Sequence, residues 1–412
     1  MDDILSQGGD REPSPWPRRL AVLGAVFLAA VGGVIYVSHS RQPHSPVAAV
    51  PTPLTSSLVP APVGLAVPGL ANEPDGIGGH TLPWADSLRL PVTGTQPAWF
   101  SPATGRSVPI GGLPAGSSGY QFTRVSGGWA VQAGPAARVE RGDDQDPACS
   151  DCVGPPPVWF LADGASSVTR VGTANQVAPA ATAGALWLTS YPVNAAVSTA
   201  AGTAREVSLS GVPLGAPVRL PAGYVISQAT DRGLLLAPVS PQPGTTADKL
   251  WDSAAPTASR TFDGVIAATA TEIAWAANCA RQCRIQLLNL STGRQATVRL
   301  PAGTSAGSGA FSPSGDFLAL QVNATGMVGD DGALGTRLEV ASVTSGHLTA
   351  VPGTFVSSDA LIGFGWPAGS DSLVAEFAFT TKEQLASWHP GATRPAVAVI
   401  PPGPEQASFI VG

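Results

Sequence analysis

The chain has 412 residues, of which only 12% are charged, and it contains 48 Gly, 40 Pro and a formal net charge of -6. Soluble domains usually carry roughly 25% charged residues, and abundant Gly and Pro favour many short strands and turns over long amphipathic helices. Lys occurs only at Lys249 and Lys382, and no basic run follows the N-terminal arginines. The sequence therefore offers no obvious phosphate-binding surface, and we do not expect nucleic acid as a partner.

The first predicted element is a membrane span at residues 20–38, LAVLGAVFLAAVGGVIYVS, which contains no charged residue. At about 1.5 Å per residue, a helix of this length reaches about 28 Å, close to the roughly 30 Å hydrocarbon core of a bilayer. Trp16 and Tyr36 stand where interfacial aromatic side chains are common. The segment is expected to cross the cell membrane once.

The charges beside the span predict its orientation. Arg18 and Arg19 directly precede the apolar run, and positive charge concentrates on the cytoplasmic side. We expect residues 1–19 to form a short cytoplasmic tail and the chain beyond residue 38 to be extracytoplasmic. A cleaved signal peptide is the alternative, but its apolar region is normally only about 7 to 15 residues long. The two arginines also permit a twin-arginine export signal.

Residues 39–79 are predicted to be a flexible linker. Eight prolines lie among small residues in this segment, which has no apolar pattern suited to packing. The linker would hold the following domain, residues 80–412, away from the membrane surface.

The segment FSPSGDFLALQV, residues 311–322, is the clearest of a series of repeats. Read alone, it is a strand, a tight turn and a second strand whose nearly continuous apolar run predicts burial on both faces. The same plan, a polar turn entering an apolar strand, occurs in SGGWAVQA (126–133), TAGALWLT (182–189), TDRGLLLA (230–237), TATEIAWA (269–276), PSGDFLAL (313–320) and AGSDSLVA (368–375). The spacing is close to the roughly 40 to 50 residues of a four-stranded propeller blade.

A second hairpin recurs between the copies of the first. It occurs seven times, at residues 97–110, 158–171, 205–220, 249–262, 284–300, 337–351 and 387–400. If the first series is the inner a–b hairpin of each blade and the second is the outer c–d hairpin, the chain is an all-β, seven-bladed propeller, with six or eight blades as alternatives. The blade containing residues 97–110 lacks an inner hairpin, and we expect TLPWADSLRL (81–90) and the C-terminal ASFIVG (407–412) to complete it.

FSPSGDFLALQV and the turn LNLSTG resemble the WD40-like and TolB-like propeller repeats of bacterial membrane-anchored envelope proteins. The resemblance extends over roughly residues 97–400, and the other copies are degenerate. No copy has the His and Trp-Asp signature of the strict WD40 family, so no binding residues are implied by the resemblance.

The four cysteines form two closely spaced pairs, Cys149 with Cys152 and Cys279 with Cys283. Outside the cytoplasm such pairs usually oxidise, and both fall in loops between strands b and c of different blades, so we expect one disulfide within each loop. A four-thiolate zinc site would have to join loops several blades apart. A redox role for CSDC is disfavoured because prolines on both sides predict a loop instead of a helix N-terminus.

Two long b–c loops, at residues 134–157 and 323–336, contain acidic residues. These are Asp143, Asp144, Asp146, Asp151, Asp330 and Asp331. Loops on one face of a rigid scaffold often contain binding sites, so we consider a partner-binding or cation-binding face. Solvated acidic loops without a ligand are the alternative.

The sequence contains no recognisable catalytic, cofactor or metal motif. His80, His347 and His389 are far apart, without metal-ligand spacing, and no nucleophile elbow or phosphate-binding glycine loop occurs. The expected inner strands, such as QVAPAATAG (176–184) and VIAATATE (265–272), are mainly small and neutral. These observations favour a non-catalytic binding or scaffold module for an envelope protein or extracellular ligand. A hydrolase or lyase with its site at the central channel, and a sensory or accessory subunit of a membrane complex, are the alternatives.

Overall fold

The computed structural model describes residues 76–77, 84–93, 96–114, 120–133, 155–192, 200–239, 247–254, 259–277, 279, 282–327, 334–357, 360–379 and 382–400. The fold lies in the unit made of Val63–Pro238 and Ala247–Gly412. The expected tail and membrane span and most of the expected linker lie outside the described residues. Within the part of the chain that is described, no helix is long and apolar enough to cross a membrane.

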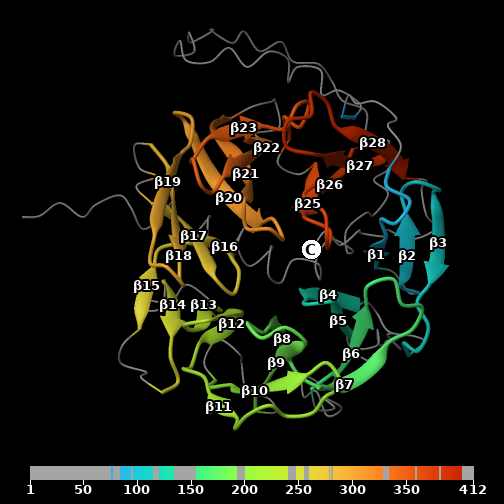
Figure 1. The fold of residues 1–412 in the computed structure, drawn as a ribbon, viewed down its shortest axis with the longest axis vertical. Helices are drawn as coiled ribbons and strands as arrows, with labels where there is room; N and C mark the ends of the chain where they lie inside the picture. Colours follow the sequence, from blue (N-terminus) through green and yellow to red (C-terminus); the bar gives the residue numbers. More distant parts are fainter. Residues whose placement is uncertain are drawn as a thin grey trace, which may run out of the picture. The chain divides into compact units, whose positions relative to one another are not determined.

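Seven antiparallel sheets form a β-propeller, as the sequence predicted (Figure 1). Blade 1 contains β1 (Leu90–Val92), β2 (Ala98–Ser101) and β3 (Arg106–Pro109). Blade 2 contains β4 (Tyr120–Val125), β5 (Gly128–Ala133), β6 (Pro157–Ala162) and β7 (Thr169–Thr173). Blade 3 contains β8 (Gln176–Pro179), β9 (Ala185–Ser190), β10 (Thr203–Ser208) and β11 (Val218–Arg219). Blade 4 contains β12 (Tyr224–Thr230), β13 (Gly233–Pro238), β14 (Asp248–Trp251) and β15 (Arg260–Phe262).

The remaining three blades follow in chain order. Blade 5 contains β16 (Val265–Ala268), β17 (Glu272–Ala277), β18 (Arg284–Asn289) and β19 (Gln295–Arg299). Blade 6 contains β20 (Thr304–Phe311), β21 (Phe317–Met327), β22 (Leu334–Ser342), β23 (Leu348–Ala350) and the short β24 (Val356–Ser357). Blade 7 contains β25 (Leu361–Gly365), β26 (Leu373–Ala378), β27 (Glu383–Trp388) and β28 (Ala396–Ile400). The two predicted hairpin series are confirmed as the a–b and c–d hairpins.

The turn in FSPSGDFLALQV is fixed by its polar residues. The backbone N–H of Ser312 donates to the carbonyl of Phe317 at 2.8 Å, and the Ser312 hydroxyl accepts the N–H of Phe317 at 3.1 Å. Gly315 has a φ of 76°, in the left-handed region that favours glycine. The serine and the glycine therefore close this hairpin together.

The core lies between the blades, which explains the continuous apolar run of β21. Leu318 and Leu320 belong to a buried cluster that includes Ile285 of blade 5, whereas Ala319 belongs to one that includes Trp366 of blade 7. Leu318 and Leu320 are both 0% exposed, and full burial of a leucine is worth roughly 1.5–3 kcal/mol. Blade 6 thus packs against a neighbouring blade on each side, and for this reason both faces of β21 are buried.

Blade 1 closes the ring against blade 7. Leu90 and Phe100 of blade 1 share a buried cluster with Val374 and Leu385 of blade 7. The predicted strand at 81–90 is wrong in extent, because Leu90 alone lies in a strand among the described residues 84–90, and β1 continues to Val92. β1 pairs only with β2 among the described strands, and the segment ASFIVG lies outside the described residues.

Candidate functional site

The connection between the b and c strands of blade 6 is the best-defined surface element among the predicted binding loops. The sequence predicted a loop over residues 323–336, and this was wrong at both ends of that range, where the described residues form strands. β21 continues to Met327 and β22 begins at Leu334, with these two residues paired. Because β21 is 11 residues long, against 6 for the b strands of blades 2, 3, 4, 5 and 7, blade 6 extends into a β-hairpin.

The short strand β24 braces the base of this hairpin. It adds to β22 through the pairs Gly335 with Ser357 and Thr336 with Val356, which gives blade 6 five strands. The ring of Phe355 lies over Gly335 so closely that a Cβ at this position would be 2.6 Å from Cζ. The glycine therefore permits the aromatic ring to pack directly on the hairpin backbone.

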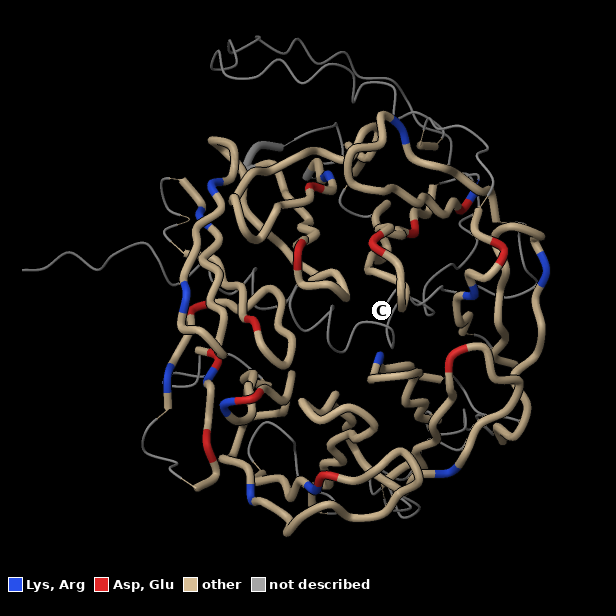
Figure 2. Tube along the Cα trace, in the orientation of Figure 1, with Lys and Arg blue, Asp and Glu red and all other residues tan. Residues whose placement is uncertain are grey.

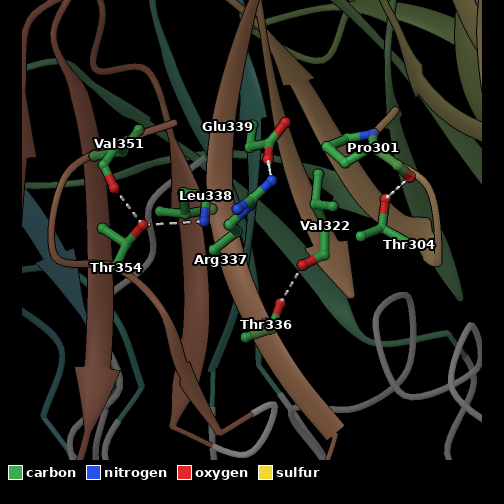
Figure 3. A network of polar contacts seen from close by, with 9 residues as sticks. All are labelled: Pro301, Thr304, Val322, Thr336, Arg337, Leu338, Glu339, Val351 and Thr354. Atoms are coloured by element: carbon green, nitrogen blue, oxygen red, sulfur yellow. Dashed lines mark hydrogen bonds and ion pairs between the residues drawn. The ribbon is translucent and has the colours of Figure 1, made fainter. Parts of the chain in front are cut away.

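Two buried threonines hold the same region (Figure 3). Thr336, 0% exposed, directs its hydroxyl to the carboxamide oxygen of Asn323 at 2.8 Å, with the carbonyl of Val322 at 3.4 Å. Thr354 accepts the N–H of Leu338 at 3.1 Å and donates to the carbonyl of Val351 at 2.8 Å. Both buried hydroxyls thus have a hydrogen-bond acceptor, and that of Thr354 also accepts a backbone N–H, so the two groups stabilise the hairpin base.

A row of neutral polar side chains connects the hairpin base with the inner strand of blade 6. The Ser308 hydroxyl donates to the carboxamide oxygen of Gln321 at 3.1 Å, and the Gln321 amide donates to Asn323 at 3.4 Å. All eight residues of β20 are partly exposed. The inner edge of blade 6 thus presents hydroxyl, carboxamide and backbone groups without charge.

An ion pair lies at the hairpin base, on the face of β22 that is turned toward blade 5. Arg337 and Glu339 alternate along β22, on the face whose cross-strand neighbours Val322 and Leu320 pack toward blade 5. Their side chains form the ion pair drawn in Figure 3, with Glu339 only 2% exposed. Burial raises the pKa of Glu339, although Arg337 opposes this shift. Removing Arg337 would leave a buried charge without compensation, so the pair is a structural element.

The described inner strands carry one charged side chain, Arg124 in β4. It forms two hydrogen bonds, of 2.5 and 2.8 Å, with the carboxylate of Asp163 in the c–d turn of the same blade. In Figure 2 most Lys and Arg positions lie along outer strands and turns. Within the described inner strands β4, β8, β12, β16, β20 and β25, no two carboxylates meet. The small, neutral inner strands predicted at 176–184 and 265–272 correspond to β8 and β16.

The predicted disulfide of blade 5 is confirmed. Cys279 and Cys283 are bonded in the b–c connection between β17 and β18, and Cys283 is 1% exposed within the core cluster shared with blade 6. Cys149 and Cys152 lie outside the described residues.

Most of the other predicted site residues also lie outside the described part of the chain. These are Asp143, Asp144, Asp146, Asp151, Asp330, Asp331, Trp16, Arg18, Arg19, Tyr36 and His80. His347 and His389 are exposed in c–d turns of blades 6 and 7, as predicted. Among the described residues, no group of three or more His, Cys, Asp or Glu side chains is arranged to hold a metal ion.

Sequence reasoning missed the buried carboxylates. The ion pair of Glu339 could have been recognised from the sequence, because Arg337 and Glu339 are two residues apart in an apolar strand and therefore share one face. Asp248, the first residue of β14, is 6% exposed and had no such signal in the sequence, because it is buried against the inner strand of the next blade.

Among the comparisons with known proteins, only those with solved structures found matches. No protein-family model matches the sequence, and no curated protein matches it. A prolyl endopeptidase structure aligns with a TM-score of 0.47 and 14% identity over 76% of this chain and 47% of that one, so this chain spans about half its length. A putative TolB from Agrobacterium tumefaciens aligns with a TM-score of 0.36 and 10% identity over 66% and 91% of the two chains. A protein from Lactobacillus plantarum aligns with a TM-score of 0.41 and 13% identity over 73% and 92%. At these values, none of the three carries an argument about ligand or reaction.

Proposed function

We propose that this chain is a membrane-anchored, extracytoplasmic β-propeller that acts as a non-catalytic binding module and docks a protein partner through the hairpin of blade 6. The observation that carries the proposal is the bracing of that hairpin. An extended b–c strand pair is held by an additional strand, a ring packed on Gly335 and two buried threonine hydroxyls. A preorganised element loses less conformational entropy on binding than a flexible loop does.

The hairpin connection, residues 328–333, contains Asp330 and Asp331. Two adjacent carboxylates favour a partner with a basic surface, since complementary charge raises the rate of association and selects the partner. The neutral inner strands and the paired Arg124 are compatible with binding and offer no acid–base pair. The membrane anchor rests on the apolar residues 20–38 and the preceding arginines.

The test replaces residues 328–333 with a two-residue Asn-Gly turn, which preserves the Met327–Leu334 pairing. Partners are covalently crosslinked in native membranes and identified by mass spectrometry for the full-length chain and for this variant. The proposal predicts a specific adduct that the trimmed variant loses while its melting temperature is unchanged. An unchanged set of adducts would contradict docking through the hairpin.

A charge variant tests whether the two carboxylates contribute to binding in addition to the shape of the hairpin. The double substitution Asp330→Asn and Asp331→Asn should weaken capture and reduce its salt dependence. The matched control is Asp231→Asn, which removes an exposed carboxylate from the a–b turn of blade 4. That control should leave capture unchanged.

A further inference from the structure

A pocket of about 280 Å³ lies at the junction of the c–d turns of blades 6 and 7. Its apolar lining includes Phe317, Val340 and Trp388, and its polar lining comes from the turn between β22 and β23. This volume is just below the roughly 300–1,000 Å³ usual for small-molecule sites. The pocket is separate from the hairpin, because it adjoins the opposite end of β22.

The apolar side chains of the pocket are held by contacts with their neighbours. Phe317 stacks on Trp366, with ring centroids 6.2 Å apart and planes 21° apart. Trp388 is 3% exposed and already donates its indole N–H to the carbonyl of Ala392 at 2.9 Å. These side chains therefore form an apolar wall in which the indole hydrogen-bond donor is already used.

The polar part contains hydrogen-bond donors. The Ser342 hydroxyl accepts the N–H of Ser345 at 3.3 Å, and the Ser345 hydroxyl accepts the N–H of His347 at 3.3 Å. Because both oxygens accept from the backbone, their O–H hydrogens remain for a ligand. His347 Nδ1 lies 3.3 Å from the Thr349 hydroxyl, and when Nδ1 accepts that hydroxyl hydrogen, Nε2 carries the ring hydrogen and can donate to a ligand.

We propose that this pocket binds a small carboxylate with an apolar body. The ring or alkyl part would lie on Phe317, Val340 and Trp388, and the two carboxylate oxygens would accept from Ser342, Ser345 and His347. Hydrogen bonds to a charged acceptor are stronger than those to a neutral one. None of the described residues that line the pocket has an acidic or carboxamide side chain, so acceptors for the several hydroxyls of a sugar are few. This inference does not depend on the proposed docking function.

The test titrates the full-length protein in detergent with benzoate as the probe, followed by ligand-observed NMR and by the imidazole signal of His347. We expect saturable binding and a shift of that signal, which is assigned with His347→Gln. The double variant Ser342→Ala and Ser345→Ala should bind at least tenfold more weakly. The matched control Ser210→Ala removes an exposed hydroxyl from the c–d turn of blade 3 and should bind normally.

Three outcomes would overturn the proposal. The first is the absence of benzoate binding at about 10 mM, a range in which even weak sites respond. The second is equal binding of neutral benzamide, which would exclude selection for a carboxylate. The third is normal binding by Thr349→Phe, which places a ring at the exposed pocket wall and should block it without lowering stability.

Discussion

The carboxylate of Asp248, at the start of β14 in blade 4, accepts a hydrogen bond of 2.8 Å from the backbone N–H of Val265, the first residue of the inner strand of blade 5. This contact joins an outer strand of one blade to the inner strand of the next. Asp248 is 6% exposed, and burial raises its pKa to about 6, with a smaller contribution from the negative charge of Asp263.

The first prediction is a pH dependence of stability that originates at Asp248. An unfolded aspartate has a pKa near 3.9, so between about pH 4 and 6 the folded state binds more protons than the unfolded state. The contribution of this group is therefore fully present below about pH 4 and is lost as the pH rises through about 6. Asp248→Asn should reduce the fall in unfolding free energy between pH 4 and 7.5 by roughly 2–3 kcal/mol, as measured by denaturant titration.

The control is Asp248→Ala, which also removes the hydrogen-bond acceptor. Because it leaves the N–H of Val265 without this partner, it should lower stability at pH 4 by about 1–3 kcal/mol, and the loss should be smaller at pH 7.5, where the variant no longer buries a charged carboxylate. The same pH dependence in Asp248→Asn as in the unmodified protein would show that this carboxyl is not the source.

The second prediction concerns the brace of the hairpin. Gly335→Ala would place a Cβ 2.6 Å from the ring of Phe355, and such overpacking typically costs about 1–3 kcal/mol. Phe355→Leu should partly restore stability in the double variant. Gly363→Ala in β25 is the matched control, since no atom lies within 4 Å of its ideal Cβ; equal losses in the two alanine variants would contradict the packing argument.

The third prediction concerns the disulfide of blade 5. Replacing both Cys279 and Cys283 with alanine should lower the unfolding free energy by about 2 kcal/mol, because the bond restricts a short loop in the unfolded chain. Mass spectrometry of peptides from non-reduced protein should show the linked pair. Recovery of both thiols as free cysteines from the native protein would refute the bond.

The fourth prediction concerns ring closure. All three residues of β1 are buried, although blade 1 has only three strands among the described residues, so we expect the C-terminal ASFIVG to add the missing strand. Deleting residues 407–412 should lower the melting temperature by several degrees, as a loss of about 1–2 kcal/mol would. An unchanged melting temperature would show that closure does not use this segment.

The architecture was predictable because each blade repeats the same local pattern. The turn at 312–316 and the alternation of Leu318, Ala319 and Leu320 are encoded by residues adjacent in sequence, so hairpin type and burial follow from them. The c–d hairpins were predictable for the same reason.

The candidate site was less predictable because its contacts join distant residues. The sequence predicted a loop at residues 323–336, whereas β22 pairs with β24 there and Phe355 packs on Gly335. The pocket was missed because its walls belong to different blades, and His347 alone has no distinguishing pattern.

The most direct measurement is site-specific photocrosslinking in native membranes, with a photoreactive residue placed at position 331 in the hairpin connection or at position 231 in the a–b turn of blade 4. The account predicts one discrete protein adduct from position 331, lost when a basic patch on the identified partner is neutralised, and none from position 231. Absence of an adduct at position 331, or the same adducts from both positions, would contradict docking through the hairpin of blade 6.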